Sequence, residues 1–348
     1  MSSSRIRLEV TVARLPLKSP FRISGYTFTD VPVLVVTLEQ GRLRGLGEAT
    51  GVYYFNDDPP AMAASIEALR DRIERGITRE ELREILPAGG ARNAVDCALW
   101  DLEAKRAGKP VWKLAGLDQV TPPITTFTLG ADDPAAMAEG AMAFADARAL
   151  KLKLSGALEI DIRRLEAVRE ARPDVWLGVD ANQGYTRETL SLLIPALLDT
   201  GVQLLEQPLP RGSDADMECL NCPIPLAADE SVQGLAGVEP LVGRFDVVNI
   251  KLDKCGGLTE ALLMVAEVRR LGLRAMVGNM VGTSLAMAPA FVVAQLCDFV
   301  DLDGPTFLAS DREPSVRYDD GRIWCPDDVW GGAALPPFLA QPPSSPDS

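Results

Sequence analysis

Histidine is absent from this sequence of 348 residues. Without an imidazole, the chain cannot carry a Ser-His-Asp or Cys-His catalytic group, a zinc site with histidine ligands or a histidine general base. Proton transfer near neutral pH must therefore use Lys, Asp, Glu, Tyr or Cys side chains. A metal ion would have to be held by carboxylates or thiolates.

Basic residues are also in short supply, with 35 Lys and Arg against 49 Asp and Glu, which gives a formal net charge of −14. This balance argues against a nucleic-acid partner, because a phosphate backbone requires a basic face on the protein. No apolar run approaches the roughly 18 residues of a membrane-spanning helix, so no membrane partner is expected. The polar start MSSSRIRLEV lacks the apolar region of a signal peptide.

Cysteines are few and scattered rather than arranged as a disulfide framework. They stand at positions 97, 219, 222, 255, 297 and 325. Together with the lack of a signal peptide, this distribution predicts a cytoplasmic protein with reduced thiols.

The length suggests about two domains of roughly 150 residues each. Residues 1–120 predict an α+β domain, because strands come first and helices follow. The expected strands and helices cover residues 5–13, 33–39, 59–76, 79–86 and 91–107, with a polar connection at 24–30 between the two strands.

From residue 121 to about 310, short apolar runs alternate with helical stretches. The runs lie at 124–129, 150–154, 176–180, 202–206, 224–229, 246–251, 273–278 and 299–303, and helical segments at 160–171, 187–199, 258–271 and 284–296. Eight strands at regular intervals, with room for a helix between them, predict an α/β fold of the (β/α) barrel type. An open doubly wound sheet is the alternative, which the lack of a Gly-rich phosphate loop disfavours.

The C-terminal residues 311–348 leave this repeat. We expect them to pack partly on the first domain. The last ten residues, rich in Pro and Ser, are expected to be disordered.

Carboxylates end three consecutive expected strands of the barrel. They are Asp180 in GVDANQGY, Glu206 in LLEQP and Asp229 in AADES. Functional groups of a barrel lie at the carboxyl ends of its strands, and neighbouring strands are about 4.8 Å apart, so the three acids should converge. Their mutual repulsion calls for a cation, and an all-oxygen ligand set favours Mg²⁺ or Mn²⁺ over Zn²⁺.

Lysines lie on the strands at either side of these acids. Lys151 and Lys153 alternate with leucines in LKLKL, so both lysines are expected to point into the barrel while the leucines face the helices. Lys251 ends the strand that follows Asp229, and Lys254 is expected to belong to the loop beyond it. A confined lysine near another cation has a lowered pKa and can act as a base.

The motifs LKLKL, GVDANQGY, LLEQP, AADES and NIKLDKCGG resemble, in order and spacing, those of the enolase superfamily, in its muconate-lactonizing-enzyme subgroup. The stretch 91–117 also resembles the helix that closes the N-terminal capping domain of that family. The resemblance implies an α+β capping domain over a (β/α)7β TIM-like barrel, and Mg²⁺ on Asp180, Glu206 and Asp229. Relatives with a His–Asp dyad as a base are excluded, because the chain has no histidine.

The segment DLDGP narrows this resemblance to the dipeptide epimerases, which carry a D-x-D motif after the eighth strand. Asp301 and Asp303 match it, and are implied to hold the α-ammonium of a dipeptide. The implied reaction is 1,1-proton transfer at the C-terminal residue, in which one lysine removes the α-proton from one face and the other returns a proton on the opposite face. The bases would be Lys153 and Lys251, with Lys151 helping to hold the substrate carboxylate.

Substrate-side residues are harder to place. Where Ala-Glu epimerases use an arginine in the first capping loop, the nearest position here is Tyr26, and the second loop, GVYYFNDDPP, is aromatic and acidic. A hydrophobic or cationic C-terminal residue of the substrate is therefore expected. Thr283, within GNMVGTSLAMAPA, is expected beside the substrate backbone.

Two other functions remain open. An N-acylamino acid racemase or cycloisomerase on the same scaffold would not need the D-x-D pair. A barrel that binds a ligand without turnover would be favoured if a metal ligand or base were missing. The oligomeric state, including a homo-oligomer, is also open.

Overall fold

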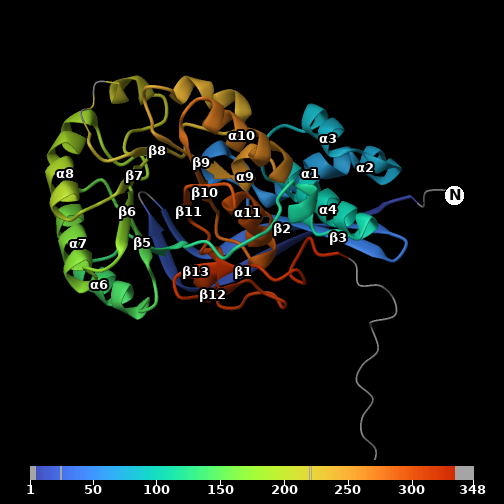
Figure 1. Cartoon of the computed structure of the whole chain (residues 1–348), viewed down its shortest axis with the longest axis horizontal. Helices are drawn as coiled ribbons and strands as arrows, with labels where there is room; N and C mark the ends of the chain where they lie inside the picture. Colours follow the sequence, from blue (N-terminus) through green and yellow to red (C-terminus); the bar gives the residue numbers. More distant parts are fainter. Residues whose placement is uncertain (1–4, 24–25, 219, 221, 334–348) are drawn as a thin grey trace, which may run out of the picture.

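The computed structural model describes residues 5–23, 26–218, 220 and 222–333. It contains an eight-stranded parallel sheet curved into a barrel with helices around it, and a second unit built on a three-stranded antiparallel sheet (Figure 1). Over these described ranges, no helix is both long and apolar enough to cross a bilayer. The tail expected to be disordered lies outside the described residues.

The N-terminal unit pairs three strands in the order β1-β2-β3 and covers them with helices. Its elements are β1 (Arg7–Ile23), β2 (Tyr26–Gln40), β3 (Leu43–Ala49), the 3₁₀ helix η1 (Tyr53–Phe55), α1 (Pro59–Ala68), α2 (Arg70–Gly76), α3 (Arg79–Ile85), α4 (Gly90–Ala107) and α5 (Val111–Leu114). The expected α+β composition is therefore observed. The strands are longer than expected, however, because β1 and β2 stay paired on both sides of a register shift between Pro16 and Phe21, and continue through most of the segment expected to connect them.

Helix α4 lies directly against β3. A Cβ atom at Gly47 would lie 2.0 Å from the carbonyl oxygen of Ala94, so the absence of a side chain at Gly47 permits this close approach. The helix ends at Gly108, which adopts a left-handed conformation with φ 60°. On the barrel side, α4 contacts α9 (Leu252–Cys255) and α10 (Leu258–Arg270).

The barrel strands pair in parallel in the order β11-β10-β9-β8-β7-β6-β5-β4. They are β4 (Thr126–Leu129), β5 (Ala149–Lys153), β6 (Trp176–Asp180), β7 (Leu204–Glu206), β8 (Leu226–Ala228), β9 (Val247–Lys251), β10 (Arg274–Gly278) and β11 (Phe299–Val300). Each lies within the apolar run that predicts it or within one residue of it. The barrel, and not the open doubly wound sheet, is thus the correct prediction.

Helices follow most of these strands. They are α6 (Pro134–Ala143), α7 (Leu158–Ala171), α8 (Arg187–Asp199), α9 (Leu252–Cys255), α10 (Leu258–Arg270) and α11 (Ser284–Ala294). After β7, β8 and β11 the chain instead forms short 3₁₀ helices, namely η2 (Asp214–Met217), η3 (Leu235–Gly237), η4 (Glu239–Leu241) and η5 (Gly304–Phe307). Leucines 150, 152 and 154 are buried in the core shared with these helices, as the alternation in LKLKL predicts.

The two end strands of the barrel sheet, β4 and β11, are joined through side chains. Thr126 donates through Oγ1 to Asp301, the backbone nitrogen of Leu302 donates to Thr125 Oγ1 at 2.8 Å, and that of Thr128 donates to Asp303 Oδ2 at 2.6 Å. We call these contacts the seam of the barrel.

The C-terminal segment forms a hairpin of β12 (Arg317–Asp319) and β13 (Arg322–Trp324) and then returns to the N-terminal unit. Trp330 Nε1 donates to the carbonyl oxygen of Leu46 in β3 at 2.7 Å, and Gly331 N donates to Asp101 of α4 at 2.9 Å. The C-terminal segment therefore packs against β3 and α4 of the N-terminal unit.

Candidate active site

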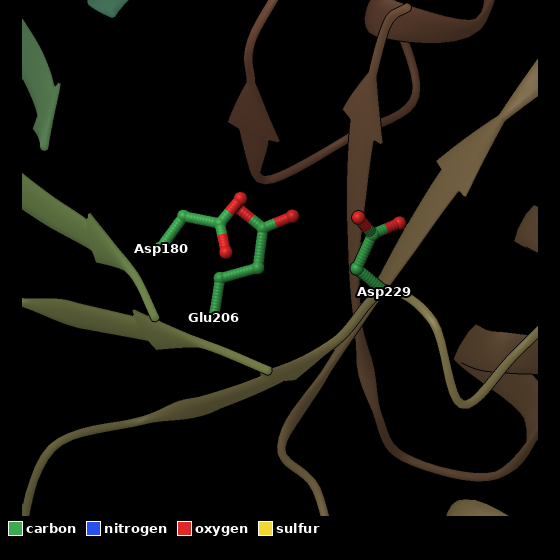
Figure 2. A group of neighbouring side chains, drawn as sticks. All are labelled: Asp180, Glu206 and Asp229. Carbon is green, nitrogen blue, oxygen red and sulfur yellow. The ribbon is translucent and has the colours of Figure 1, made fainter. Parts of the chain in front are cut away.

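Three carboxylates meet at the carboxyl ends of neighbouring barrel strands. Asp180 ends β6, Glu206 ends β7, and Asp229 directly follows β8. One oxygen of each lies within 4.8 Å of the others, and all three residues are buried. Figure 2 shows the carboxyl groups of Asp180 and Glu206 side by side, with Asp229 across from them. The structure thus brings together the three acids that the strand ends predict.

Two lysines approach these acids from opposite sides. Lys153 ends β5 and Lys251 ends β9, so the strands of the three acids lie between them in the sheet. Lys153 Nζ donates to Asp180 Oδ2, and Lys251 Nζ donates to Asp229 Oδ2 at 2.7 Å. Both lysines are buried, at 8% and 5% exposure, and both point inward as predicted.

The charges of this cluster shift the pKa values of its members. Burial alone would lower the pKa of Lys251, but the negative charges of Asp229 and Glu206 outweigh burial, so its pKa lies well above the usual value. The lowered pKa expected from the sequence is therefore wrong for Lys251, because the neighbouring acids have a larger effect than the neighbouring cations. Burial raises the pKa of Glu206, and the charge of Asp180 adds to this effect. For Asp229, the cations of Lys251 and Lys254 outweigh burial and hold the pKa below its usual value. The site thus holds its charges by mutual compensation.

Lys151 links the three acids to the seam. Its Nζ donates to Asp301 and, at 3.4 Å, to Glu206 Oε2. Burial would lower the pKa of Lys151, but the charges of Asp301 and Glu206 outweigh it and raise the pKa above the usual value. Burial together with the charge of Asp301 raises the pKa of Asp303 to about 6. Lys151, Asp301 and Asp303 thus form one buried group at the edge of the site.

A cavity of about 430 Å³ opens above these residues. Its floor includes Lys151, Lys153, Asp229, Lys251, Asp301 and Asp303. Its upper wall comes from the N-terminal unit and the loops after β10 and β11, and includes Leu17, Phe21, Phe28, Val31, Tyr53, Tyr54, Met280 and Phe307. The volume lies within the usual range for small-molecule sites.

Two expected substrate residues are placed differently from the others. Thr283 caps the N-terminus of α11, donates through N and Oγ1 to Glu48 at 2.7 and 2.6 Å, and is not among the residues that line the cavity. Tyr26 begins β2, but its side chain lies outside the described part of the chain. Their contact with substrate therefore stays a prediction.

Three residues of the site were not predicted as site residues from the sequence. Lys254, expected in the loop, is 1% exposed, and its Nζ donates to the carbonyl and Oδ1 of Asp229 and to the carbonyl of Asn249. Asn249 donates through Nδ2 to Glu206 Oε1 at 2.6 Å. The alternation that aligns Lys151 with Lys153 also aligns Asn249 with Lys251, and could have indicated it.

The third missed residue is Glu230, the neighbour of Asp229 in AADES. It is 1% exposed and lines the cavity. Its Oε2 atom has no hydrogen-bond partner among the described residues. Burial and the charge of Asp229 raise its pKa to about 8. Only its position next to Asp229 could have indicated it.

The donor set fits a hard divalent cation. It consists of three buried carboxylates with converging oxygens, and a fourth carboxylate, Glu230, adjoins them. Oxygen ligands of this kind suit Mg²⁺, which is commonly held by a few carboxylates and by substrate oxygens.

Comparison with known families covers most of the chain. Residues 5–116 match the family described as mandelate racemase / muconate lactonizing enzyme, N-terminal domain. Residues 135–332 match the family described as enolase C-terminal domain-like.

Similar proteins act on dipeptides and on acylated amino acids. The chain is 42% identical over 310 residues to an L-Ala-D/L-Glu epimerase of Escherichia coli, covering 88% of this chain and 96% of that protein. It is 38% identical over 306 residues to an N-acetyl-D-glutamate racemase of Pseudoalteromonas, covering 86% and 96%. Among solved structures, a dipeptide epimerase from Methylococcus capsulatus in complex with Mg and L-Arg-D-Lys superposes with a TM-score of 0.86 at 31% identity, covering 92% of this chain and 96% of that chain.

Proposed function

The chain belongs to the mandelate racemase/muconate lactonizing enzyme family of the enolase superfamily, and from this premise we propose that it is a Mg²⁺-dependent dipeptide epimerase. The enzyme is an isomerase that inverts the α-carbon of the C-terminal residue. The observation that carries the proposal is the pair of buried lysines on opposite sides of three converging carboxylates.

Each residue of the site has a defined task in this reaction. Asp180, Glu206 and Asp229 would hold Mg²⁺, which when bound supplies positive charge to stabilise the negative charge that develops on the substrate carboxylate. Lys153 removes the α-proton from one face of the substrate, and Lys251 delivers a proton to the other face. Reversal exchanges the two roles. Lys151 also lines the floor of the cavity, where its positive charge favours an anionic group.

Incorporation of solvent deuterium tests this function directly. When the protein is incubated with Mg²⁺ and a dipeptide in D₂O, deuterium should enter the α-position of the C-terminal residue while both epimers form. No deuterium uptake across a broad dipeptide library would contradict the proposal.

An N-acylamino acid racemase is the second candidate, supported by the similarity to the N-acetyl-D-glutamate racemase of Pseudoalteromonas. The two candidates differ in the group that occupies the region of Asp301 and Asp303. A free α-ammonium would be stabilised by these two buried carboxylates, whereas a neutral acyl group would gain no such charge-assisted bond.

Asp303→Asn should separate these candidates. A hydrogen bond to a charged group contributes about 1.5–3 kcal/mol, so we expect kcat/KM for a free dipeptide to fall by about tenfold to a few hundredfold. Acetylation of the substrate's N-terminus should have a similar effect on the wild-type enzyme, while Mg²⁺ affinity measured by calorimetry stays unchanged in the variant. Equal turnover of the free and acetylated substrates would favour the racemase.

The pH profile gives a control for this variant. Because the pKa of Asp303 is raised to about 6, its carboxylate is ionised above that pH and becomes protonated below it. A protonated Asp303 no longer attracts an ammonium group, so kcat/KM of the wild type should decline as the pH falls below about 6. Asp303→Asn lacks this titrating carboxyl group, so its kcat/KM should fall less steeply below pH 6 than that of the wild type.

We further propose that the epimerised residue has an apolar side chain. The cationic side chains that line the cavity within the described ranges are Lys151, Lys153 and Lys251, and each is bonded to a buried carboxylate. The acids of the upper wall hold backbone groups, since Asp57 accepts from Gly90 N at 2.6 Å and Asp58 caps α1. A hydrophobic substrate residue therefore fits this wall better than the cationic residue also expected from the sequence.

A panel of L-Ala-Xaa dipeptides tests this specificity. Leucine or phenylalanine at Xaa should exceed glutamate in kcat/KM by about tenfold or more, because a buried carboxylate without a cation pays a desolvation cost. Phe28→Ala removes one ring of the upper wall, and should reduce turnover of the large apolar substrates while sparing L-Ala-L-Ala. A preference for glutamate would contradict the assignment.

We place the protein in the cytoplasm, a location supported by the free thiols of the described cysteines. A dipeptide is its proposed partner. A homo-oligomer stays an open prediction.

A further inference from the structure

The short helix α9 connects three parts of the molecule that lie far apart in the sequence. It begins directly after Lys251 and contains Asp253 and Lys254. Lys254 donates to Asp229, one of the three converging acids. Asp253 points instead toward the N-terminal unit and contacts the segment between β3 and α1, residues 50–58, which we call the capping loop.

Asp253 holds the start of the capping loop through backbone hydrogen bonds. Its Oδ1 atom accepts from Thr50 N at 2.9 Å, from Gly51 N at 3.4 Å and from the side chain of Asn93 in α4 at 3.4 Å. Asp253 is 6% exposed. Bonds from backbone N–H groups to a buried carboxylate are charge-assisted and fix the direction of the chain that donates them.

The capping loop forms part of the cavity wall. Thr50, Gly51, Tyr53, Tyr54 and Asn56 all line the cavity. Gly51 adopts φ +83°, and a Cβ atom there would lie 2.3 Å from the carbonyl oxygen of Asp57, so the loop makes a tight turn at the point that Asp253 holds. The side chain of Thr50 adds a bond to the carbonyl of Val281 at 2.7 Å.

We propose that Asp253 is a positioning residue that fixes the capping loop over the active site, so that α9 aligns the aromatic wall that contacts the substrate with the strand end that carries Lys251. This inference rests on the proposed function, because its kinetic test measures the epimerisation of a dipeptide. Asp253 itself would touch neither substrate nor metal.

The chain offers a matched control in Asp96. This residue is also a buried aspartate at the contact of the two units, because it lies on α4 and accepts from Thr259 of α10 through N at 3.0 Å and Oγ1 at 2.6 Å. Burial raises the pKa of both aspartates to about 6. Within the described part of the chain, the hydrogen bonds of the Asp96 carboxylate come from Thr259 and not from the capping loop. Its loss should therefore weaken the contact between the units without releasing the loop.

Hydrogen exchange of the full chain, without substrate, is the first measurement. Asp253→Ala should accelerate amide exchange in residues 50–58 by about tenfold or more, whereas Asp96→Ala should change it less than about twofold. Each variant is compared at a temperature equally far below its own unfolding temperature. Asp253→Asn keeps an acceptor oxygen but loses the charge, and should give an intermediate acceleration of about threefold.

Steady-state kinetics with a dipeptide is the second measurement. Asp253→Ala should raise KM by about tenfold or more with a smaller change in kcat, and Asp253→Asn should restore most of the loss. Asp96→Ala should lower the unfolding temperature and leave KM unchanged.

The outcomes separate the inference from the proposed function. Unchanged loop exchange in Asp253→Ala, or the same exchange and KM changes in Asp96→Ala, would overturn the positioning role. If Asp253→Ala does not fold, wild-type loop exchange in Asp253→Asn would overturn it instead. Faster loop exchange in a protein that epimerises no dipeptide would uphold the contact with the loop and count against the proposed function alone.

Discussion

Replacing Lys251 with alanine is expected to abolish epimerisation, with kcat lower by at least about a thousandfold, which is within the usual contribution of a positioned general acid or base. The proposed reaction needs a base on one face of the α-carbon and an acid on the other, and Lys251 is proposed to supply one of these two groups. Lys254, which also contacts Asp229, cannot replace it, because its Nζ already donates to Asp229 and to the carbonyl of Asn249.

The remaining base should still work on its own face of the substrate. In Lys251→Ala, Lys153 should continue to exchange the α-proton of one epimer with deuterium from the solvent, without forming the other epimer. Lys153→Ala should show the mirror result, with exchange confined to the other epimer. Chiral separation followed by mass spectrometry measures the deuterium content of each epimer and the amount of the other epimer that forms.

Lys251→Arg provides the control for charge. The guanidinium keeps a positive charge beside Asp229, but it stays protonated at any accessible pH and cannot act as a base. Both Lys251 variants should therefore fail to epimerise. Near wild-type epimerisation by Lys251→Arg would mean that Lys251 serves only to pair with Asp229.

Removal of the metal is expected to have an effect of comparable size. Exhaustive chelation should abolish epimerisation, and added Mg²⁺ should restore it. Asp229→Asn should lose most of the activity and bind Mg²⁺ more weakly by at least about tenfold in calorimetry, because it removes the charge of one of the three proposed carboxylate ligands. The calorimetric readout does not depend on turnover.

Asp320→Asn is a control with the same change of charge. Asp320 pairs with Arg148 at the surface, and its side chain is 59% exposed, so both Mg²⁺ affinity and activity should stay close to wild type. Full activity of the wild-type protein after its metal content has been measured near zero would contradict the assignment of the three acids.

The main features of the proposed active site follow from the sequence because strand geometry is local. Lys151 and Lys153 are two residues apart and must share a face, and Asp180, Glu206 and Asp229 each end a strand of a regular repeat. The contacts of Lys254 and Asp253 could not be predicted in this way. They depend on a helix of four residues and on a partner loop about 200 positions earlier in the chain.

The N-terminal strands show the same limit. Pro16, Ser19, Pro20 and the following polar stretch suggest that β1 should end early, yet β1 and β2 remain paired across the register shift. Long-range pairing thus overrides the local preference of these residues. The proposed preference for apolar substrate residues could not be derived from the sequence for the same reason. It depends on Phe28 and Val31, which line the cavity and lie on the part of β2 that local patterns did not predict.

The seam ties substrate recognition to the integrity of the fold. Asp301 and Asp303 bond to Thr126 and Thr128 of β4, so the two acids proposed to bind the ammonium group also join the ends of the sheet. Any substitution that adapts this end of the cavity to a new substrate must therefore be tolerated by the fold as well. During divergence toward other substrates, compensating changes on β4 would be expected to precede or accompany the loss of either acid.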